Sequence, residues 1–169
     1  MDGEYCAICG GNLGRHIVCL GEQPLANKYP TAQQFANEFS EKLKIYMCDG
    51  CRYLYIPCSI DRNFFFEDYY YASSVNRELV SHFNTFAAEL KKADRKKILD
   101  IGSNDGIFLK SLRDHDIEFL GVDPSVNVGE IANKQGLTTK IGFFSSLSVS
   151  EIESEWGIPD TIVASSVFT

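Results

Sequence analysis

Four cysteines in two pairs constrain how this chain can fold more than any other feature. Cys6 and Cys9 form one Cys-x2-Cys pair, and Cys48 and Cys51 form the other. Two intervening residues let both thiolates of a pair reach one tetrahedral Zn²⁺ at about 2.3 Å, and two pairs complete its four ligands. The alternative is two disulfides or unpaired core thiols. The paired spacing favours zinc, and four protein ligands leave no open position for catalysis, so we expect a structural site.

The cysteine-rich segment is expected to form a small zinc-binding domain over residues 1–62. It holds every cysteine of the chain, and β-prone stretches over 15–20, 42–47 and 53–57 predict a zinc-ribbon-like fold. Gly10 and Gly50 are expected to supply the positive φ of the two tight turns. Cys19 and Cys58 are expected to be buried small hydrophobic side chains rather than ligands. So short a segment cannot easily build an apolar core, and the metal is expected to replace one.

Composition and charge exclude several classes of partner. The 169 residues carry a formal net charge of −7, which argues against a nucleic-acid partner. No stretch has the ~18 consecutive apolar residues of a membrane span, and the N-terminus lacks the basic segment and apolar run of a secretory signal. We therefore expect a cytoplasmic protein with no membrane partner, in a compartment where thiols stay reduced and favour metal binding over disulfides.

A different pattern follows the cysteine-rich segment. Residues 63–95 are expected to form a connecting aromatic segment and a helix over 76–93, where apolar residues recur at three- and four-residue steps. In residues 96–169, strands and helices alternate. The predicted strands cover 97–101, 118–122, 138–141 and 161–168, and the predicted helices cover 106–114, 128–135 and 147–155. This alternation predicts a parallel sheet of order 3-2-1-4, the first half of a doubly wound α/β domain.

The predicted sheet has four strands, whereas open sheets of this class commonly have about five to seven. We therefore expect the chain to be a fragment of a longer protein, with little or no activity by itself. The fourth strand, over 161–168, is expected to be buried on its faces and unpaired along one edge. Such an edge favours self-association.

The loop after the first strand of this sheet is the most informative stretch. Asp100, Gly102 and Gly106 form the pattern Asp-x-Gly-x-x-x-Gly, which leads directly into a helix. Gly102 permits a tight turn and the close approach of a ligand, and Gly106 lets the helix pack closely. A second acid, Asp123, ends the next strand, where a carboxylate can accept hydrogen bonds from both hydroxyls of an adenosine ribose.

The residue types in this loop favour a cationic ligand. A dinucleotide fingerprint needs glycine where Asn104 and Ile107 stand, so a nicotinamide dehydrogenase is disfavoured. Asp100 and Asp105 would repel a pyrophosphate, whereas an acid at the strand end suits a cation such as the ammonium group of S-adenosylmethionine. The alternative is a plain strand-to-helix turn with an N-capping Asn or Asp.

The order of these motifs resembles the family of S-adenosylmethionine-dependent sugar C-methyltransferases. The cysteine pairs flank Gly21-Glu-Gln-Pro-Leu-Ala-Asn27, and they are followed by Tyr69-Tyr-Tyr71, Asp100-Ile-Gly-Ser-Asn-Asp-Gly106 and Gly121-Val-Asp-Pro-Ser125. The resemblance covers essentially the whole chain. It implies a zinc-binding domain, a partial Rossmann-like methyltransferase domain over residues 96–169, and a further C-terminal domain. It also implies that the substrate is a nucleotide-activated keto- or deoxysugar.

The resemblance implies roles for individual residues as well. The methionine end of the cofactor would be lined by Asp100, Gly102, Ser103, Asn104 and Gly106. Asp123 would bind the ribose, and Pro124 would lie next to the adenine. Phe143 and Phe144 would wall the adenine or else belong to the core. Tyr71 is the candidate catalytic residue, a phenol that could orient a sugar hydroxyl or ketone; packing between domains is the alternative for this tyrosine cluster.

The implied reaction is C-methylation next to a sugar ketone. A general base removes the proton α to the carbonyl, and the enolate carbon attacks the sulfonium methyl group in line. The sequence assigns no residue as that base. The rival hypothesis is a non-catalytic zinc-ribbon interaction module with a degenerate nucleotide-binding fold. It predicts the same cysteine site but no binding of the cofactor.

Overall fold

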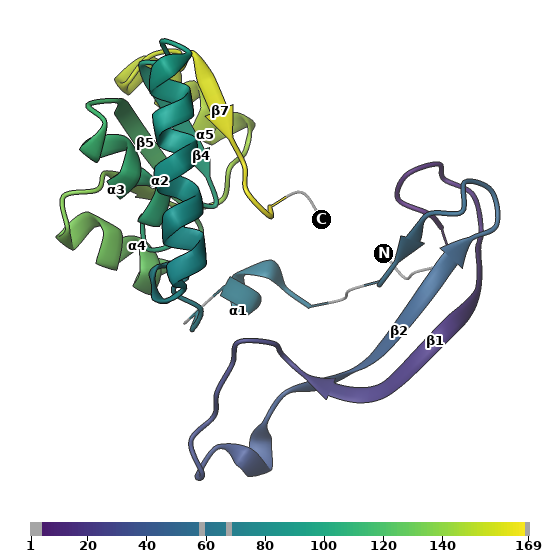
Figure 1. Ribbon diagram of the computed structural model, residues 1–169. Helices are drawn as coiled ribbons and strands as arrows, with labels where there is room; N and C mark the ends of the chain where they lie inside the picture. The colour runs from purple at the N-terminus through teal and green to yellow at the C-terminus, as the bar shows by residue number, and fades with distance from the viewer. Residues whose placement is uncertain (1–4, 58–59, 67–68, 168–169) are drawn as a thin grey trace. The chain divides into compact units, whose positions relative to one another are not determined.

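The computed structural model describes residues 5–57, 60–66 and 69–167. The chain divides into two compact units, with the division between Phe65 and Phe66. Figure 1 shows an antiparallel ribbon in the N-terminal unit and a sheet with helices on its faces in the C-terminal unit. The predicted α/β fold class, with a small cysteine-bearing N-terminal domain, is confirmed.

The N-terminal unit is built on a three-stranded antiparallel sheet of order β1-β2-β3. Its strands are β1 (Leu13–Pro24), β2 (Ser40–Cys48) and β3 (Leu54–Tyr55), so the three predicted strands are confirmed. Register shifts interrupt the pairing of β1 with β2, and such bulges bend and twist a ribbon, as Figure 1 shows. A 3₁₀ helix, η1 (Phe35–Asn37), lies in the loop between β1 and β2, and α1 (Arg62–Phe66) follows the sheet.

The N-terminal unit has almost no apolar core. Among its described residues, the buried hydrophobic ones are Cys6, Leu25 and Cys48, and two of these belong to the cysteine pairs. Cys19 is exposed, so its predicted burial is wrong; its neighbours Val18 and Leu20 are exposed as well, so this part of β1 buries no apolar side chains among the described residues of the unit. Cys58 lies outside the described residues. The scarcity of buried apolar side chains agrees with the expectation that a metal replaces the core.

The C-terminal unit alternates helices and strands as predicted. Its elements are η2 (Ser73–Val75), α2 (Arg77–Lys92), β4 (Lys97–Ile101), α3 (Ile107–Asp114), β5 (Glu118–Asp123), α4 (Val126–Lys134), β6 (Thr139–Ile141), α5 (Ser146–Glu155) and β7 (Thr161–Val163). All strand pairs of the sheet are parallel, and the order is β6-β5-β4-β7. This order confirms the prediction that the first strand of the sheet lies between the second and the fourth.

Two apolar clusters cover the two faces of this sheet. On one face, Phe83 and Ala87 of α2 pack with Phe108 and Leu112 of α3 and with Ile98 of β4. On the other face, the side chain of Ile152 of α5 packs against alternate residues of the central strands, which are Leu99, Ile101, Leu120 and Val122. Alternation of side chains along β4 and β5 therefore assigns each face its own helices, as a doubly wound sheet requires.

The last strand differs from its prediction. β7 has three residues rather than eight, and it pairs with β4 through Thr161–Val163. Ile162 is 58% exposed, so the predicted burial of this strand is wrong. The chain turns at residues 165–166, where Ser166 has a φ of 57°, and this turn ends the strand early. β7 lies at the edge of the described sheet.

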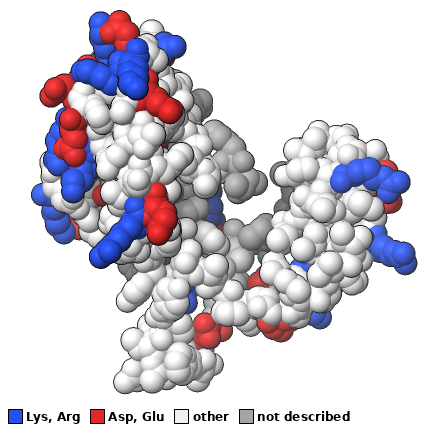
Figure 2. All heavy atoms as spheres, viewed as in Figure 1, with Lys and Arg blue, Asp and Glu red and all other residues white. Residues whose placement is uncertain are grey.

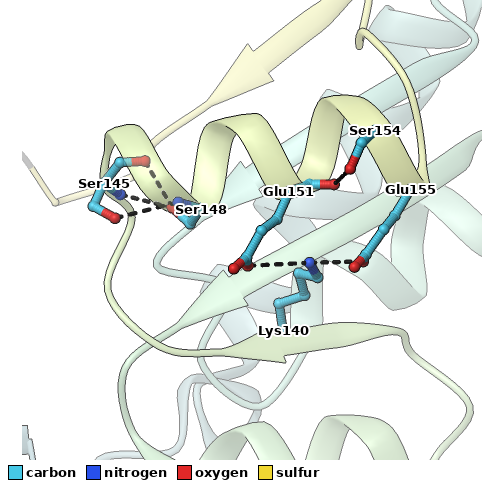
Figure 3. Close-up of polar contacts among 6 residues, drawn as sticks. All are labelled: Lys140, Ser145, Ser148, Glu151, Ser154 and Glu155. Atoms are coloured by element: carbon cyan, nitrogen blue, oxygen red, sulfur yellow. Dashed lines mark hydrogen bonds and ion pairs between the residues drawn. The ribbon is translucent and has the colours of Figure 1, made fainter.

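Helix α5 is fixed to the sheet by a charged contact (Figure 3). The Lys140 ammonium group on β6 lies 3.6 Å from the carboxylate of Glu151 and 2.8 Å from that of Glu155, one turn apart on α5. The hydrogen bond with Glu155 and the two carboxylate charges raise the pKa of Lys140. At the other end of α5, Ser145 and Ser148 form a reciprocal capping box. These contacts set the position of α5 along the face of the sheet.

Gly106 is expected to be intolerant of substitution. It has a φ of 82°, and a Cβ there would come within 2.7 Å of Leu137 Cδ1 and 3.1 Å of Ala132 Cβ, both in buried residues. Gly106→Ala should therefore lower the free energy of unfolding by about 2–4 kcal/mol, through backbone strain and overpacking together. Gly136→Ala is the matched control, since Gly136 has a φ of 74° but open space around it. Urea denaturation of the two variants should show at least about 1 kcal/mol between them; equal losses would contradict the packing argument.

Figure 2 shows how charged side chains are distributed on one face of the C-terminal unit. On the face drawn in Figure 2, lysine and arginine side chains of the C-terminal unit alternate with aspartate and glutamate side chains. None of the helices in the described part of the chain combines the length and the apolar character that a membrane span needs.

Candidate cofactor and metal sites

The four paired cysteines come together at one end of the N-terminal ribbon. Their sulfur atoms all lie within 4.8 Å of one another. The Sγ atoms of Cys6 and Cys51 are 3.7 Å apart, and those of Cys9 and Cys48 are 3.5 Å apart. Sulfurs at the corners of a tetrahedron with Zn–S bonds of ~2.3 Å would be about 3.8 Å apart. The cluster therefore has the dimensions of a four-thiolate zinc site.

The two turns that carry these cysteines share one backbone feature. In each turn the residue after the second cysteine has a positive φ, which is 69° at Gly10 and 64° at Arg52. The prediction for Gly10 is confirmed, and the prediction for Gly50 is wrong because the left-handed position falls on Arg52. Gly50 instead faces the cluster, since a Cβ there would lie 3.7 Å from Cys9 Sγ.

The cluster also favours thiolates over disulfides. The five cysteines that the structure describes are all free thiols. The backbone N–H of Cys51 donates to Cys48 Sγ at 3.5 Å, and this hydrogen bond is the main cause that lowers the pKa of Cys48 to about 6. A thiol of that pKa is largely ionised at neutral pH, which is the form that binds a metal. Burial and the three neighbouring cysteines shift the pKa of Cys51 the other way, upward, so the four thiols do not all ionise equally easily.

In the C-terminal unit, the two predicted acids lie near the carboxyl ends of adjacent strands. Asp100 of β4 pairs with Gly121 of β5, so Asp123 lies two residues further towards the same end. The two residues are 4% and 5% exposed. β4 is also the strand from which the sheet continues to both sides, with β5 on one side and β7 on the other. Ligands of open α/β sheets bind at the carboxyl ends of the strands at such a switch point.

Asp123 is held firmly by the backbone. Its Oδ2 accepts a hydrogen bond from the N–H of Asn104, and its Oδ1 accepts one from the N–H of Ser125, both at 2.8 Å. A carboxylate has about four acceptor positions, so both oxygens can still accept a further donor. The arrangement fits a pair of ribose hydroxyls.

Asp100, unlike Asp123, is not held by hydrogen bonds from the backbone of the described residues. No described residue donates a hydrogen bond to its carboxylate, and burial, followed by the charge of Asp123, raises its pKa to about 8. A buried carboxyl group without a partner is costly unless a ligand or a proton offsets the charge. The cationic ammonium group of S-adenosylmethionine fits this position.

The glycine loop has the predicted backbone but an unexpected neighbour. Gly102 has a φ of 75°, and a Cβ there would come within 2.5 Å of Val167 Cγ2. The close approach that we predicted for a ligand is therefore made by Val167, from the turn after β7. The Ser103 side chain is buried against Gly121, and its hydroxyl has no partner among the described residues.

The tyrosine segment, residues 69–74, lies beside this loop. The Asn104 side chain donates to the carbonyl of Tyr71 and accepts from the N–H of Ser73, and the Asn127 side chain bonds to the backbone of Tyr69. Tyr71 is 41% exposed. The contacts of Asn127 and Val167 were not predicted. Asn127 belongs to no recognisable motif in a single sequence. Val167 was assigned to the fourth strand, which was predicted too long.

The two predicted adenine-wall residues follow β6, and Gly142, directly before Phe143, donates its N–H to the carbonyl of Asp123 at 2.8 Å. The Phe143 ring lies 5.7 Å from that of Phe66, edge to face, and Phe144 packs against the apolar cluster under α5. Pro124 follows Asp123 and is half-buried.

Comparisons with known proteins agree with this two-unit organisation. Residues 6–66 match a family model described as a zinc binding domain, and residues 71–169 match one described as a methyltransferase domain. A curated relative is the C-methyltransferase NovU of Streptomyces niveus, 24% identical over 160 residues, which cover 92% of this chain. The chain spans 38% of the length of that relative.

Two solved structures illustrate the similarity of the C-terminal unit to known folds. The plantazolicin methyltransferase BpumL in complex with SAH has a TM-score of 0.36 and 20% identity, covering 50% of this chain and 34% of that one. A SAM-dependent methyltransferase from Archaeoglobus fulgidus has a TM-score of 0.30 and 21% identity, covering 43% of this chain and 33% of that one.

Proposed function

Because the chain belongs to the family of methyltransferase domains, we propose that it is the cofactor-binding part of an S-adenosylmethionine-dependent C-methyltransferase. The observation that carries the proposal is the buried, unpartnered carboxyl group of Asp100 next to the backbone-held carboxylate of Asp123. One acid suits the ammonium end of the cofactor, and the other suits its ribose. Gly102, Ser103, Asn104 and Gly106 form the connecting loop, and Pro124 lies next to the ribose acid.

The proposed substrate is a nucleotide-activated keto- or deoxysugar. Support comes from the order of motifs and from the 24% identity to a C-methyltransferase. When bound, S-adenosylmethionine supplies an electrophilic methyl group. The residues of this chain would orient that donor, and the Tyr71 phenol would orient a hydroxyl or ketone of the sugar. No described residue is assigned as the general base.

In the N-terminal unit, we propose that Cys6, Cys9, Cys48 and Cys51 bind one structural Zn²⁺. Their spacing and the sulfur–sulfur distances support this assignment. The division into a zinc-binding domain over residues 1–62, a connecting segment over 63–95 and a cofactor-binding domain over 96–169 belongs to the same proposal, as does a cytoplasmic location.

Calorimetric titration with S-adenosylmethionine and S-adenosylhomocysteine tests the proposal. We expect weak 1:1 binding by this part of the protein, weakened by about tenfold or more in Asp123→Ala, because that variant loses the charge-assisted acceptor for the ribose. Asp114→Ala changes an exposed acid on α3 and is the matched control, expected to bind as the unchanged chain does. Equal affinities for both variants would contradict the assignment of Asp123. No binding by the unchanged chain would favour the interaction-module hypothesis.

The edge strand β7 supports a further part of the proposal, self-association of the chain through residues 161–168. Ile162 is 58% exposed on this edge strand, and unpaired edges with apolar side chains promote pairing. Ile162→Lys is expected to shift a dimer, or larger assemblies, to a monomer in size-exclusion chromatography. A stable monomer of the unchanged chain would contradict this part of the proposal.

A further inference from the structure

The tyrosine segment is bound through its backbone rather than its side chains. The Asn127 side chain accepts from the N–H of Tyr69 at 3.2 Å and donates to its carbonyl at 2.8 Å. The Asn104 side chain donates to the carbonyl of Tyr71 and accepts from the N–H of Ser73, both at 2.9 Å. These contacts fall on alternate residues, as when a sheet edge binds an extended peptide. The segment is therefore positioned by the loop that follows β4 and by the first turn of α4.

The contacts extend to the start of η2. The N–H of Ser74 donates to Asp105 Oδ2 at 3.2 Å, so Asn104 and Asp105 together satisfy the first two N–H groups of this turn. α2 begins directly afterwards, with Asn76 as its N-cap. Placement of the segment thus depends on two successive residues of the glycine loop.

Asn104 connects this segment to the ribose acid. Its side chain holds Tyr71 and Ser73, while its own N–H donates to Asp123 Oδ2 at 2.8 Å. Both sets of bonds are made from a left-handed backbone with a φ of 50°, which Asn tolerates better than most residues. Asn104 is 9% exposed, so water does not readily replace these bonds. One buried residue therefore carries a continuous hydrogen-bonded path from Asp123 to the tyrosine segment.

We propose that Asn104 is a positioning residue. It couples the hydrogen bonding of Asp123, and ligand binding there, to the placement of the tyrosine segment. A ligand held by Asp123 fixes the loop, the loop fixes the amide of Asn104, and that amide fixes the backbone next to Tyr71. By reciprocity, a segment held in place favours binding at Asp123. The identity of the ligand rests on the proposed function, whereas the coupling itself does not.

Amide hydrogen exchange of Ser73 and Ser74 tests the coupling without any ligand. Four proteins are compared: the unchanged chain, Asn104→Gly, Asp123→Ala and the double variant. Glycine keeps the left-handed backbone and the N–H to Asp123, and removes only the side chain. We expect exchange about two- to tenfold faster in Asn104→Gly, the range for one lost hydrogen bond. Asp123→Ala should also accelerate it, and the double variant should exchange no faster than Asn104→Gly.

If the effects of Asn104→Gly and Asp123→Ala on amide exchange were additive, the proposal would be overturned, because the effects of substitutions at independent sites add. Asn127→Ala is the matched control: it releases Tyr69 but leaves the path through Asn104, so its effect should add to that of Asp123→Ala. Should the alanine variant at Asp123 unfold, Asp123→Asn replaces it, since one amide oxygen cannot accept from both N–H groups.

A second arm uses S-adenosylhomocysteine. It should slow exchange of Ser73 and Ser74 in the unchanged chain, and it should no longer do so in Asn104→Gly. Binding to the unchanged chain without this difference would also overturn the coupling. Absence of binding to the unchanged chain would count against the proposed function alone, because the ligand-free comparison still decides the coupling.

Discussion

Cys48→Ser is expected to release the metal and unfold the N-terminal unit. The variant removes one of four sulfurs that lie within 4.8 Å of one another, and a fully buried one. Structural zinc contributes ~10–16 kcal/mol to the folding of small zinc domains. The described residues of this unit include three buried hydrophobic residues, and two of them are cysteines of the cluster, so no other core can compensate. Zinc content, far-UV circular dichroism and limited proteolysis of residues 5–65 should all report the loss.

The matched control for this experiment is Cys19→Ser. Cys19 lies on β1, is exposed and belongs to neither cysteine pair. We expect this variant to retain one zinc ion per chain and to resist proteolysis as the unchanged chain does. A Cys48→Ser variant that kept a full zinc ion and a folded ribbon would contradict the four-thiolate assignment.

Asp100→Asn is expected to have two opposite effects, on binding and on stability. Loss of the carboxylate should weaken binding of S-adenosylhomocysteine by about 10- to 100-fold, the range for a hydrogen bond between charged groups. The same substitution should stabilise the ligand-free protein at alkaline pH. It removes a buried acid whose pKa is raised to about 8 by burial and by the charge of Asp123.

The dependence on pH follows from the direction of this shift. Between the unfolded pKa of 3.8 and the folded pKa of about 8, the folded chain holds a proton that the unfolded chain has lost. The free energy of unfolding therefore falls as the pH rises through this range, by up to ~1.4 kcal/mol per pH unit for one proton. The Asn variant lacks this slope, so its advantage should grow from pH 5 to pH 8.

Urea denaturation at several pH values measures this effect. Asp114→Asn is the control, since Asp114 lies exposed on α3 and should leave the slope unchanged. Parallel pH profiles for the unchanged chain and Asp100→Asn would show that folding does not raise the pKa of Asp100, and would contradict the expected dependence of stability on pH.

The sequence was sufficient to predict most of the C-terminal unit because several local signals agreed. Apolar strands, helix periodicity and turn glycines together predicted the order of elements, and the bounds agree within about two residues except at β7. The strand order followed from the doubly wound arrangement that alternating strands and helices indicate. Residues 161–168 were predicted too long because their apolar composition contains no signal for the turn at residues 165–166.

The site was predictable only where its chemistry lies in local motifs. The cysteine pairs, Asp100 and Asp123 each stand in a recognisable turn or strand end. Asn127 and Val167 act through contacts with residues 58 and 65 positions away, Tyr69 and Gly102, and no local pattern specifies such contacts. The burial of Cys19 was wrong for a related reason, since exposure depends on whether a second layer covers β1.

The strand order β6-β5-β4-β7 has a consequence for how the domain assembles during synthesis. Among the four strands of this sheet, β4 is synthesised first, and it lies in the interior of the sheet. The later strands are therefore added on either side of it. Its pairing with β5 closes a short loop and can form early, whereas its other edge stays open until Thr161–Val163 leaves the ribosome. A nascent chain that ends before residue 161 therefore leaves one edge of β4 unpaired, and unpaired strand edges promote aggregation.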